Sequence, residues 1–176
     1  MDSPVPLAAL SADEAERHVA ELGALLHACV LDGASVGFIL PYAPAQAEAF
    51  WSAQVLPALR QGTRTLLVAR VAGRIAGTVQ LDCDTPSNQP HRAEVRKLLV
   101  HPRHRRRGIA RALMMDLEDR ARAARRRLLT LDTRTGDAAE PLYAALGYQH
   151  AGVIPEFCLD VRGRRLDSTT IMYKLL

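Results

Sequence analysis

Residues 100–110 constrain the fold more than any other part of the chain, because they join a strand-like run to a helix through a turn rich in arginine. Residues 92–100 are typical of a β-strand, which Pro102 ends. Apolar residues then recur at helical spacing and predict an amphipathic helix: Ile109, Leu113, Leu117, Ala121 and Ala124. On its outer face, Asp116 with Arg120 and Glu118 with Arg122 are spaced to form ion pairs.

The turn before this helix is suited to hold a diphosphate. The N–H groups of a first helical turn lack intrahelical acceptors and lie at the positive end of the helix dipole. Gly108 lets the backbone approach an anion closely, and Ala110 keeps the next position small. The segment is not a nucleotide P-loop, because no Gly-Lys-Ser/Thr follows and the glycines of a dinucleotide fingerprint are missing.

The positive charge of the chain is concentrated around this turn. Residues 101–127 hold ten arginines and three acids, a net charge of +7, whereas the whole chain carries +4. A local patch of this kind favours a compact anionic ligand over a long nucleic-acid track. Zinc-finger spacing and an aromatic-rich RNA-binding strand are both missing from the sequence, so nucleic acid is not expected as a partner.

The length of 176 residues predicts one domain, residues 1–176. The three cysteines form no Cys-x-x-Cys pair and are odd in number, which favours neither a disulfide framework nor a zinc site. The start of the chain has no basic leader and no apolar run approaches the ~20 residues that span a bilayer, so we expect a cytoplasmic protein without membrane contact. Lysine is nearly absent (Lys97, Lys174), a bias that we interpret as genomic.

The order of the expected elements indicates an α+β fold with a mixed sheet. Helices are expected over residues 11–31, where Ser11 and Glu14 resemble a capping box, and over residues 44–59. A hairpin of residues 65–71 and 75–83 precedes the strand at 92–100, and the long helix leads to a parallel strand at 128–133. A short helix over 137–146 begins either with an Asp137/Glu140 capping box or with Pro141, and Gly147 ends it. Strands at 148–154 and 170–175 flank a polar excursion, 155–168.

Two motifs in this order resemble the GNAT acetyltransferase superfamily. Arg105-x-x-Gly108-x-Ala110 resembles its acyl-CoA pyrophosphate loop, although Ala110 stands where Gly is commoner, and Leu142-Tyr143-Ala-Ala-Leu146-Gly147-Tyr148 resembles its second signature. The resemblance implies a three-layer α/β/α arrangement: a mixed, mostly antiparallel sheet with helices on both faces and a parallel strand pair splayed at the acetyl-CoA site. Residues 33–38, 93–98 and 131–133 look most like the tabtoxin-resistance type, which N-acetylates a β-lactam-bearing amino acid toxin.

The resemblance also implies acetyl-CoA as co-substrate, with no metal. The residues expected to bind acetyl-CoA are those matching the loop, the preceding strand end and the second signature: Leu98, Leu99, Val100, Arg105, Arg106, Arg107, Gly108, Ile109, Ala110, Arg111 and Tyr143. A backbone N–H near Leu98 is expected to stabilise the developing oxyanion, because the strand splays there and leaves main-chain groups unpaired.

Acetyl transfer needs a neutral amine, and alkyl amines are mostly protonated at neutral pH, so a general base is required. Glu94 is the leading candidate, at the spacing before Gly108 where several GNAT enzymes place a glutamate. With strict alternation it shares a strand face with Arg96, Leu98 and Val100. The alternative is an exposed glutamate paired with Arg96 or Arg92.

Two further residues are candidates for catalysis. Asp132 ends the parallel strand, where it would attract a cationic substrate or relay its proton; the alternative is a turn or cap acid. Tyr143 matches the family's tyrosine that protonates the departing thiolate; the alternative is a core tyrosine. The residues expected to contact the acceptor are Val36, Phe38, Glu94, Asp132 and Phe157.

We therefore expect an acetyl-CoA-dependent N-acetyltransferase that acts on the amine of a small molecule, such as an amino-acid-like toxin or antibiotic. Neither the cysteines nor the histidines form a nucleophile pattern, which favours direct attack in a ternary complex. A protein N-terminal or lysine acetyltransferase and a non-catalytic acyl-CoA-binding module are the alternatives. The identity of the amine, the acyl-chain preference and the choice between monomer and homodimer stay open.

Overall fold

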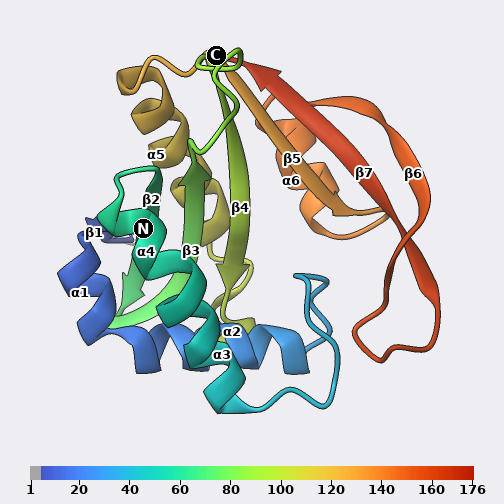
Figure 1. Cartoon of the computed structure of the whole chain (residues 1–176). Helices are drawn as coiled ribbons and strands as arrows, with labels where there is room; N and C mark the ends of the chain where they lie inside the picture. Colours follow the sequence, from blue (N-terminus) through green and yellow to red (C-terminus); the bar gives the residue numbers. More distant parts are fainter. Residues whose placement is uncertain (1–4) are drawn as a thin grey trace.

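The computed structural model describes residues 5–176; residues 1–4, on which the expectation of no basic leader falls, lie outside the described residues. Figure 1 shows the whole chain. The strands are β1 (Leu7–Leu10), β2 (Arg64–Val71), β3 (Arg74–Asp82), β4 (Arg92–Val100), β5 (Leu128–Arg134), β6 (Gln149–Leu159) and β7 (Leu166–Leu175). The helices are α1 (Ala12–Arg17), α2 (Val19–Leu31), α3 (Pro44–Phe50), α4 (Leu56–Arg60), α5 (Ile109–Ala123) and α6 (Ala139–Ala145).

The strands form one mixed sheet in the order β1-β2-β3-β4-β5-β7-β6, in which only the β4–β5 pair is parallel. One core, around the fully buried Trp51 and Leu26, lies between the sheet and α2 to α4. A second core, around Leu113 and Leu129, lies between the opposite face and α5 and α6. The predicted α+β fold with a mostly antiparallel sheet and helices on both faces is confirmed (Figure 1).

The parallel pair is short, and the two strands then diverge. Only Arg92–Glu94 of β4 pair with Leu128–Thr130 of β5. Beyond these three residues, the second half of β4 has no partner on its β5 side, and the backbone groups there face the space between the strands. The splayed pair implied by the family resemblance is therefore present.

A β-bulge at Lys97, whose φ is +49°, interrupts the alternation along β4. Ala93 and Val95 pack into the α5 core, so Glu94 faces the α2 side; after the bulge, Leu98 and Val100 pack into the α5 core instead. Leu99 packs against the α2 core. The expectation that Glu94, Arg96, Leu98 and Val100 share one face was wrong, because an extra residue in a strand reverses the side-chain alternation after it.

The N-terminal helices are less regular than expected. The 11–31 helix is interrupted at His18 into α1 and α2, although the Ser11/Glu14 capping box is confirmed. The 44–59 helix passes through a π-helical turn, Trp51–Val55, before α4. Pro57 explains this turn, because proline has no N–H and its ring clashes with the carbonyl four residues earlier in a regular helix.

The C-terminal strands are longer than expected, and residues 155–168 are no polar excursion. β6 continues to Leu159 and β7 begins at Leu166, joined by a turn in which the Asp160 N–H donates to Arg165 O. β6 is an edge strand, where Pro155 is tolerated because the missing N–H can face away from the sheet. The strand β1 was not predicted.

The short helix α6 begins at Ala139, so it starts neither with the predicted Asp137/Glu140 capping box nor with Pro141. The Glu140 carboxylate accepts the Gly136 N–H at 2.8 Å instead of capping its own helix. Gly147, with φ +88°, follows the end of the helix as predicted. No helix within residues 5–176 combines the length and the apolar character needed to cross a membrane. The same residues contain no group of three or more His, Cys, Asp or Glu side chains placed to hold a metal ion.

Candidate active site

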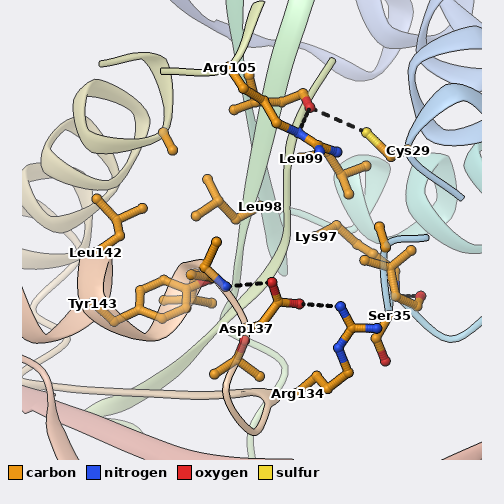
Figure 2. Close-up of a pocket in the computed structure, with 18 of the residues that line it drawn as sticks. Cys29, Ser35, Lys97, Leu98, Leu99, Arg105, Arg134, Asp137, Leu142 and Tyr143 are labelled. Atoms are coloured by element: carbon orange, nitrogen blue, oxygen red, sulfur yellow. Dashed lines mark hydrogen bonds and ion pairs between the residues drawn. The ribbon is translucent and has the colours of Figure 1, made fainter. Parts of the chain in front are cut away.

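A cleft of about 770 Å³ opens where β4 and β5 diverge. Its walls come from the loop after α2, β4, the first turn of α5, the end of β5, α6 and β6. Figure 2 shows Tyr143 and Leu142 on one side of Leu98, with Lys97 and Ser35 on the other. Segments far apart in the sequence therefore converge on the gap between the two parallel strands.

The N-terminus of α5 forms one end of this cleft. Gly108 caps the helix with φ +74°, and the first helical bond is the Ala112 N–H to Gly108 O, at 3.0 Å. The N–H groups of Ile109, Ala110 and Arg111 therefore have no acceptor within the helix. A Cβ built on Gly108 would meet no atom within 4 Å, so the space beside it is open. The free N–H groups and the open space at this end of the cleft suit an anion.

The arginines of the basic turn differ in what they contact. Arg106 and Arg111 line the cleft, whereas Arg107 does not. Arg105 also lines it, but its guanidinium forms an ion pair with Asp32. The Arg105 Nε donates to Val100 O at 3.3 Å, a hydrogen bond drawn beside Arg105 in Figure 2. Arg105 thus ties the turn to the end of α2 as well as adding positive charge.

Tyr143 is buried and lines the cleft from α6, so the core alternative and the site prediction describe the same residue. Burial, followed by the negative charges of Asp132 and Asp137, raises the pKa of its phenol well above the usual range. The phenol therefore keeps its proton at neutral pH and can donate a hydrogen bond to a group in the cleft.

Glu94 lines the cleft at the end of a chain of ion pairs. Arg96 Nε lies 3.2 Å from Glu94 Oε1, and Arg96 Nη1 donates to Asp82 Oδ2 at 3.1 Å. Asp82 in turn pairs with Arg64. The alternative of a Glu94–Arg96 pair is therefore present, but the carboxylate is also at the cleft, so pairing orients it there.

Asp132 lies within β5, opposite Ile171 of β7, and is not a turn or cap acid. The Thr169 hydroxyl donates to its Oδ2 at 3.3 Å. Its side chain is exposed to the cleft. Asp132 is thus the carboxylate of the cleft that lacks a basic partner among the described residues.

Of the predicted acceptor contacts, Val36 and Phe157 line the cleft but Phe38 does not. The Phe38 ring packs on Tyr42, with centroids 4.7 Å apart, and on the edge of Phe50 at 5.4 Å. Gly37, with φ +90°, turns the chain between Val36 and Phe38 and sends Phe38 away from the cleft.

Sequence reasoning missed several residues that line the cleft: Ser35, Lys97, Arg134, Asp137 and Cys158. Lys97 was overlooked because strict alternation places its side chain on the other face of β4 from Glu94. The bulge brings both side chains to the same face. Its rarity was the available signal, since Lys97 and Lys174 are the two lysines of the chain. Arg134 and Asp137 form an ion pair at 3.1 Å beside Tyr143.

A family model and a relative both match this chain and indicate the same family. The model of the acetyltransferase (GNAT) family matches residues 37–148. An uncharacterized N-acetyltransferase encoded in the hisH-hisA intergenic region of Azospirillum brasilense is 35% identical over 112 residues, which are 62% of this chain and 64% of the relative. The match thus spans just under two thirds of that relative's length.

Solved structures share the fold at low identity. A ribosomal-protein-alanine N-acetyltransferase from Brucella melitensis aligns with a TM-score of 0.78 and 20% identity, covering 98% of this chain and all (100%) of the other. A GNAT superfamily phosphinothricin acetyltransferase from Sinorhizobium meliloti, in complex with AcCoA, aligns with the same TM-score, 0.78, and 20% identity. The alignment covers 99% of this chain and 89% of the other. At such identities the likeness establishes the fold and leaves the substrate undecided.

Proposed function

Because the chain belongs to the GNAT acetyltransferase family, we propose that it transfers the acetyl group of acetyl-CoA to the amine of a small, amino-acid-like molecule. The observation that carries the proposal is the cleft between β4 and β5. It joins an anion-binding helix terminus at one end to two carboxylates and a protonated tyrosine at the other. The residues 1–176 would act as one catalytic domain.

The cleft suits the parts of acetyl-CoA in order. The free N–H groups of the first α5 turn, with Arg106 and Arg111, would hold the diphosphate. The unpaired edge of β4 from Val95 to Val100 offers backbone groups for the amides of the pantetheine arm, and Leu98 offers an apolar surface. The open space beside Gly108 admits phosphate next to the backbone.

Acetyl-CoA supplies the activated acetyl group, and the residues at the other end of the cleft supply proton transfer. Glu94 would accept the proton of the incoming ammonium, directly or through a water, and Asp132 would hold the cation in place. A backbone N–H near Leu98 would stabilise the charge that develops on the carbonyl oxygen. Tyr143 would give its proton to the departing sulfur as the C–S bond breaks and the C–N bond forms. The second proton, which the nitrogen loses as it becomes an amide, would return to the Tyr143 oxygen, which leaves CoA-SH, an amide and a neutral phenol.

The acceptor side of the cleft favours a small substrate. Two apolar side chains from different elements line the cleft there: Val36 from the loop after α2 and Phe157 from β6. The phosphinothricin acetyltransferase among the structural neighbours acts, by its name, on an amino-acid-like compound, and residues 33–38, 93–98 and 131–133 resemble the tabtoxin-resistance type. A role in resistance to a toxin or antibiotic of this class is consistent with both.

A thiol-release assay with acetyl-CoA tests the proposal. We expect CoA-SH release with α-amino acids, including phosphinothricin, and little with diamines, aminoglycosides or a peptide with a free N-terminal alanine. Turnover of the peptide alone would instead support a protein N-terminal acetyltransferase. Acetyl-CoA binding without turnover of any amine in the panel would support a non-catalytic acyl-CoA-binding module and contradict the proposal.

A further inference from the structure

Lys97 holds a positive charge in the acceptor half of the cleft without an acidic partner. Its Nζ donates to the Val36 carbonyl oxygen at 2.7 Å and lies 5.6 Å and 5.4 Å from the ring centroids of Phe38 and Phe50. Within residues 5–176 no carboxylate forms an ion pair with it. An ammonium has three donors, and the Val36 carbonyl accepts one of them, so among the described residues two have no oxygen acceptor.

Most of the other charged groups of the cleft are already paired. Of the four carboxylates in the lining, all but Asp132 are paired with arginine: Asp32 with Arg105, Glu94 with Arg96, and Asp137 with Arg134. Asp132 accepts only the Thr169 hydroxyl. Arg106 and Arg111 lie at the diphosphate end of the cleft. The acceptor half therefore retains one unpaired anion, Asp132, and one unpaired cation, Lys97.

A zwitterionic acceptor would satisfy both groups. We propose that Lys97 binds the carboxylate of an amino acid substrate whose amine lies toward Asp132 and Glu94, so that Lys97 selects amino acids over simple amines. This inference rests on the proposed function and names its substrate class. A partly buried charge without a partner is costly, and a ligand carboxylate removes that cost only when the charge is opposite.

The surroundings of Lys97 suit lysine better than arginine, the commoner basic residue of this chain. Only two of the 23 Lys and Arg residues are lysine. The position offers one carbonyl oxygen and two ring faces to the cation, which suits a compact ammonium better than a planar guanidinium with five donors. The Val36 carbonyl holds the ammonium beside the loop after α2 and accepts one of its three donors.

The test compares each amino acid with its own amide. For wild type, Lys97→Met and Lys97→Gln, kcat/KM is measured by thiol release with alanine, leucine, glutamate and 4-aminobutyrate and with the corresponding carboxamides. For each pair, the acid-to-amide ratio of kcat/KM in a variant is then divided by the same ratio in the wild type. The difference in basicity between the two amines is the same for both enzymes and therefore cancels. Lys174→Met is the matched control, because it removes the other lysine, which lies against Glu118 and Leu146 O outside the cleft lining.

We expect the wild type to prefer the acid of at least one pair, and Lys97→Met to reduce that ratio about 10²-fold, since a lost charge-assisted contact to a substrate typically has an effect of this size. Lys174→Met should keep the wild-type ratio even if its melting temperature falls. Unchanged ratios in a folded Lys97→Met or Lys97→Gln protein, or a wild type that prefers amides or diamines throughout, would overturn the inference and leave the acetyltransferase function standing.

A second measurement does not depend on how the variants fold. Carboxylic acids that lack the amine, such as 4-methylpentanoate, should inhibit the wild type competitively against the amino acid, whereas 4-methylpentanamide should not. Equal inhibition by acid and amide would overturn the inference. A wild type that binds acetyl-CoA but acetylates no amine would overturn the proposed function, and the inference with it.

Discussion

Burial raises the pKa of the Tyr143 phenol, and this gives the first prediction at the scale of single residues. Because the pKa of its phenol is raised, Tyr143 stays protonated over the whole accessible assay range and does not produce a high-pH loss of activity. Tyr143→Phe should lower kcat by about 10²-fold with acetyl-CoA affinity nearly unchanged, because the hydroxyl is needed only as charge develops on sulfur. Steady-state kinetics with acetyl-CoA titration by calorimetry check this, and full activity in the variant would remove Tyr143 from the mechanism.

The proposed roles of Glu94 and Asp132 are distinguished by how the activity of their variants depends on pH. Glu94→Gln should lower the rate by roughly 10²–10⁴-fold near neutral pH, with partial rescue as pH rises and free amine becomes abundant. Asp132→Asn should act mainly through the KM of the amine, because its proposed role is to hold a cation. The measurement is a set of pH–rate profiles for both variants. A wild-type profile for Glu94→Gln would make Asp132 the candidate base.

The residues that sequence could place in the cleft are those carried by motifs or by strand ends. Glu94, Asp132, Tyr143 and Gly108 all line it, because each lies at a position fixed by the strand–turn–helix connection or by the second signature. Lys97 could not be predicted, since the bulge that brings it there depends on pairing between β3 and β4. Phe38 was misplaced because one positive φ at Gly37 redirects the chain.

At the scale of elements, the N-terminus of α5 predicts how acetyl-CoA affinity depends on Gly108. Gly108→Asp should abolish binding, because it puts a negative charge where the diphosphate meets the backbone. Gly108→Asn is the matched control: it has a similar size and tolerates positive φ, so it separates charge from strain. Calorimetric titration should show much weaker binding for Asp than for Asn. Equal affinities would show that the diphosphate lies elsewhere.

A buried ion pair joins three elements behind the cleft. Lys174 Nζ, on β7, donates to Glu118 Oε2 of α5 and to Leu146 O after α6, both at 2.6 Å. Glu118 was expected on the outer face with Arg122, but its side chain is only 6% exposed and Arg122 is 3.8 Å away. The helix pattern predicted the spacing and could not show that β7 and α6 cover this part of α5.

Removing one partner of this pair should be costly, because it leaves a buried charge uncompensated. Lys174→Met should lower the free energy of unfolding by about 3 kcal/mol, and Glu118→Gln added to it should recover part of the loss. Urea denaturation of the single and double variants measures both. A double variant that is no more stable than Lys174→Met would show that Glu118 does not depend on Lys174.

Which elements could be predicted depended on local signals. The hairpin β2–β3, the β4–α5 connection and the parallel β5 follow from hydrophobic periodicity and turn residues. The second half of the β6–β7 hairpin did not, because Pro155, the bulge at Glu156 and the polar turn are typical of a loop; they become strand only because the two segments pair. Long-range pairing of this kind leaves no short-range pattern.

At the scale of the whole molecule, the sheet is weakest where the cleft opens. The strands before the cleft and those after it are joined in the sheet by three β4–β5 residue pairs only. The core beneath α5 compensates, because it contains Leu67 and Val79 from the first set of strands and Leu129 and Met172 from the second. The fold thus places its ligand site across its shortest ladder while one continuous core holds both sides together.

This arrangement predicts the unfolding behaviour of the chain as a single domain. Calorimetry should show one transition with equal calorimetric and van't Hoff enthalpies, because neither half can expose its part of the α5 core alone. Acetyl-CoA at one hundred times its dissociation constant should stabilise the protein by about 2.7 kcal/mol, which corresponds to a shift on the order of 5–10 °C. The shift should be absent in Gly108→Asp. Two separate transitions in the free protein that merge when acetyl-CoA binds would mean that the ligand, and not the shared core, joins the two halves of the sheet.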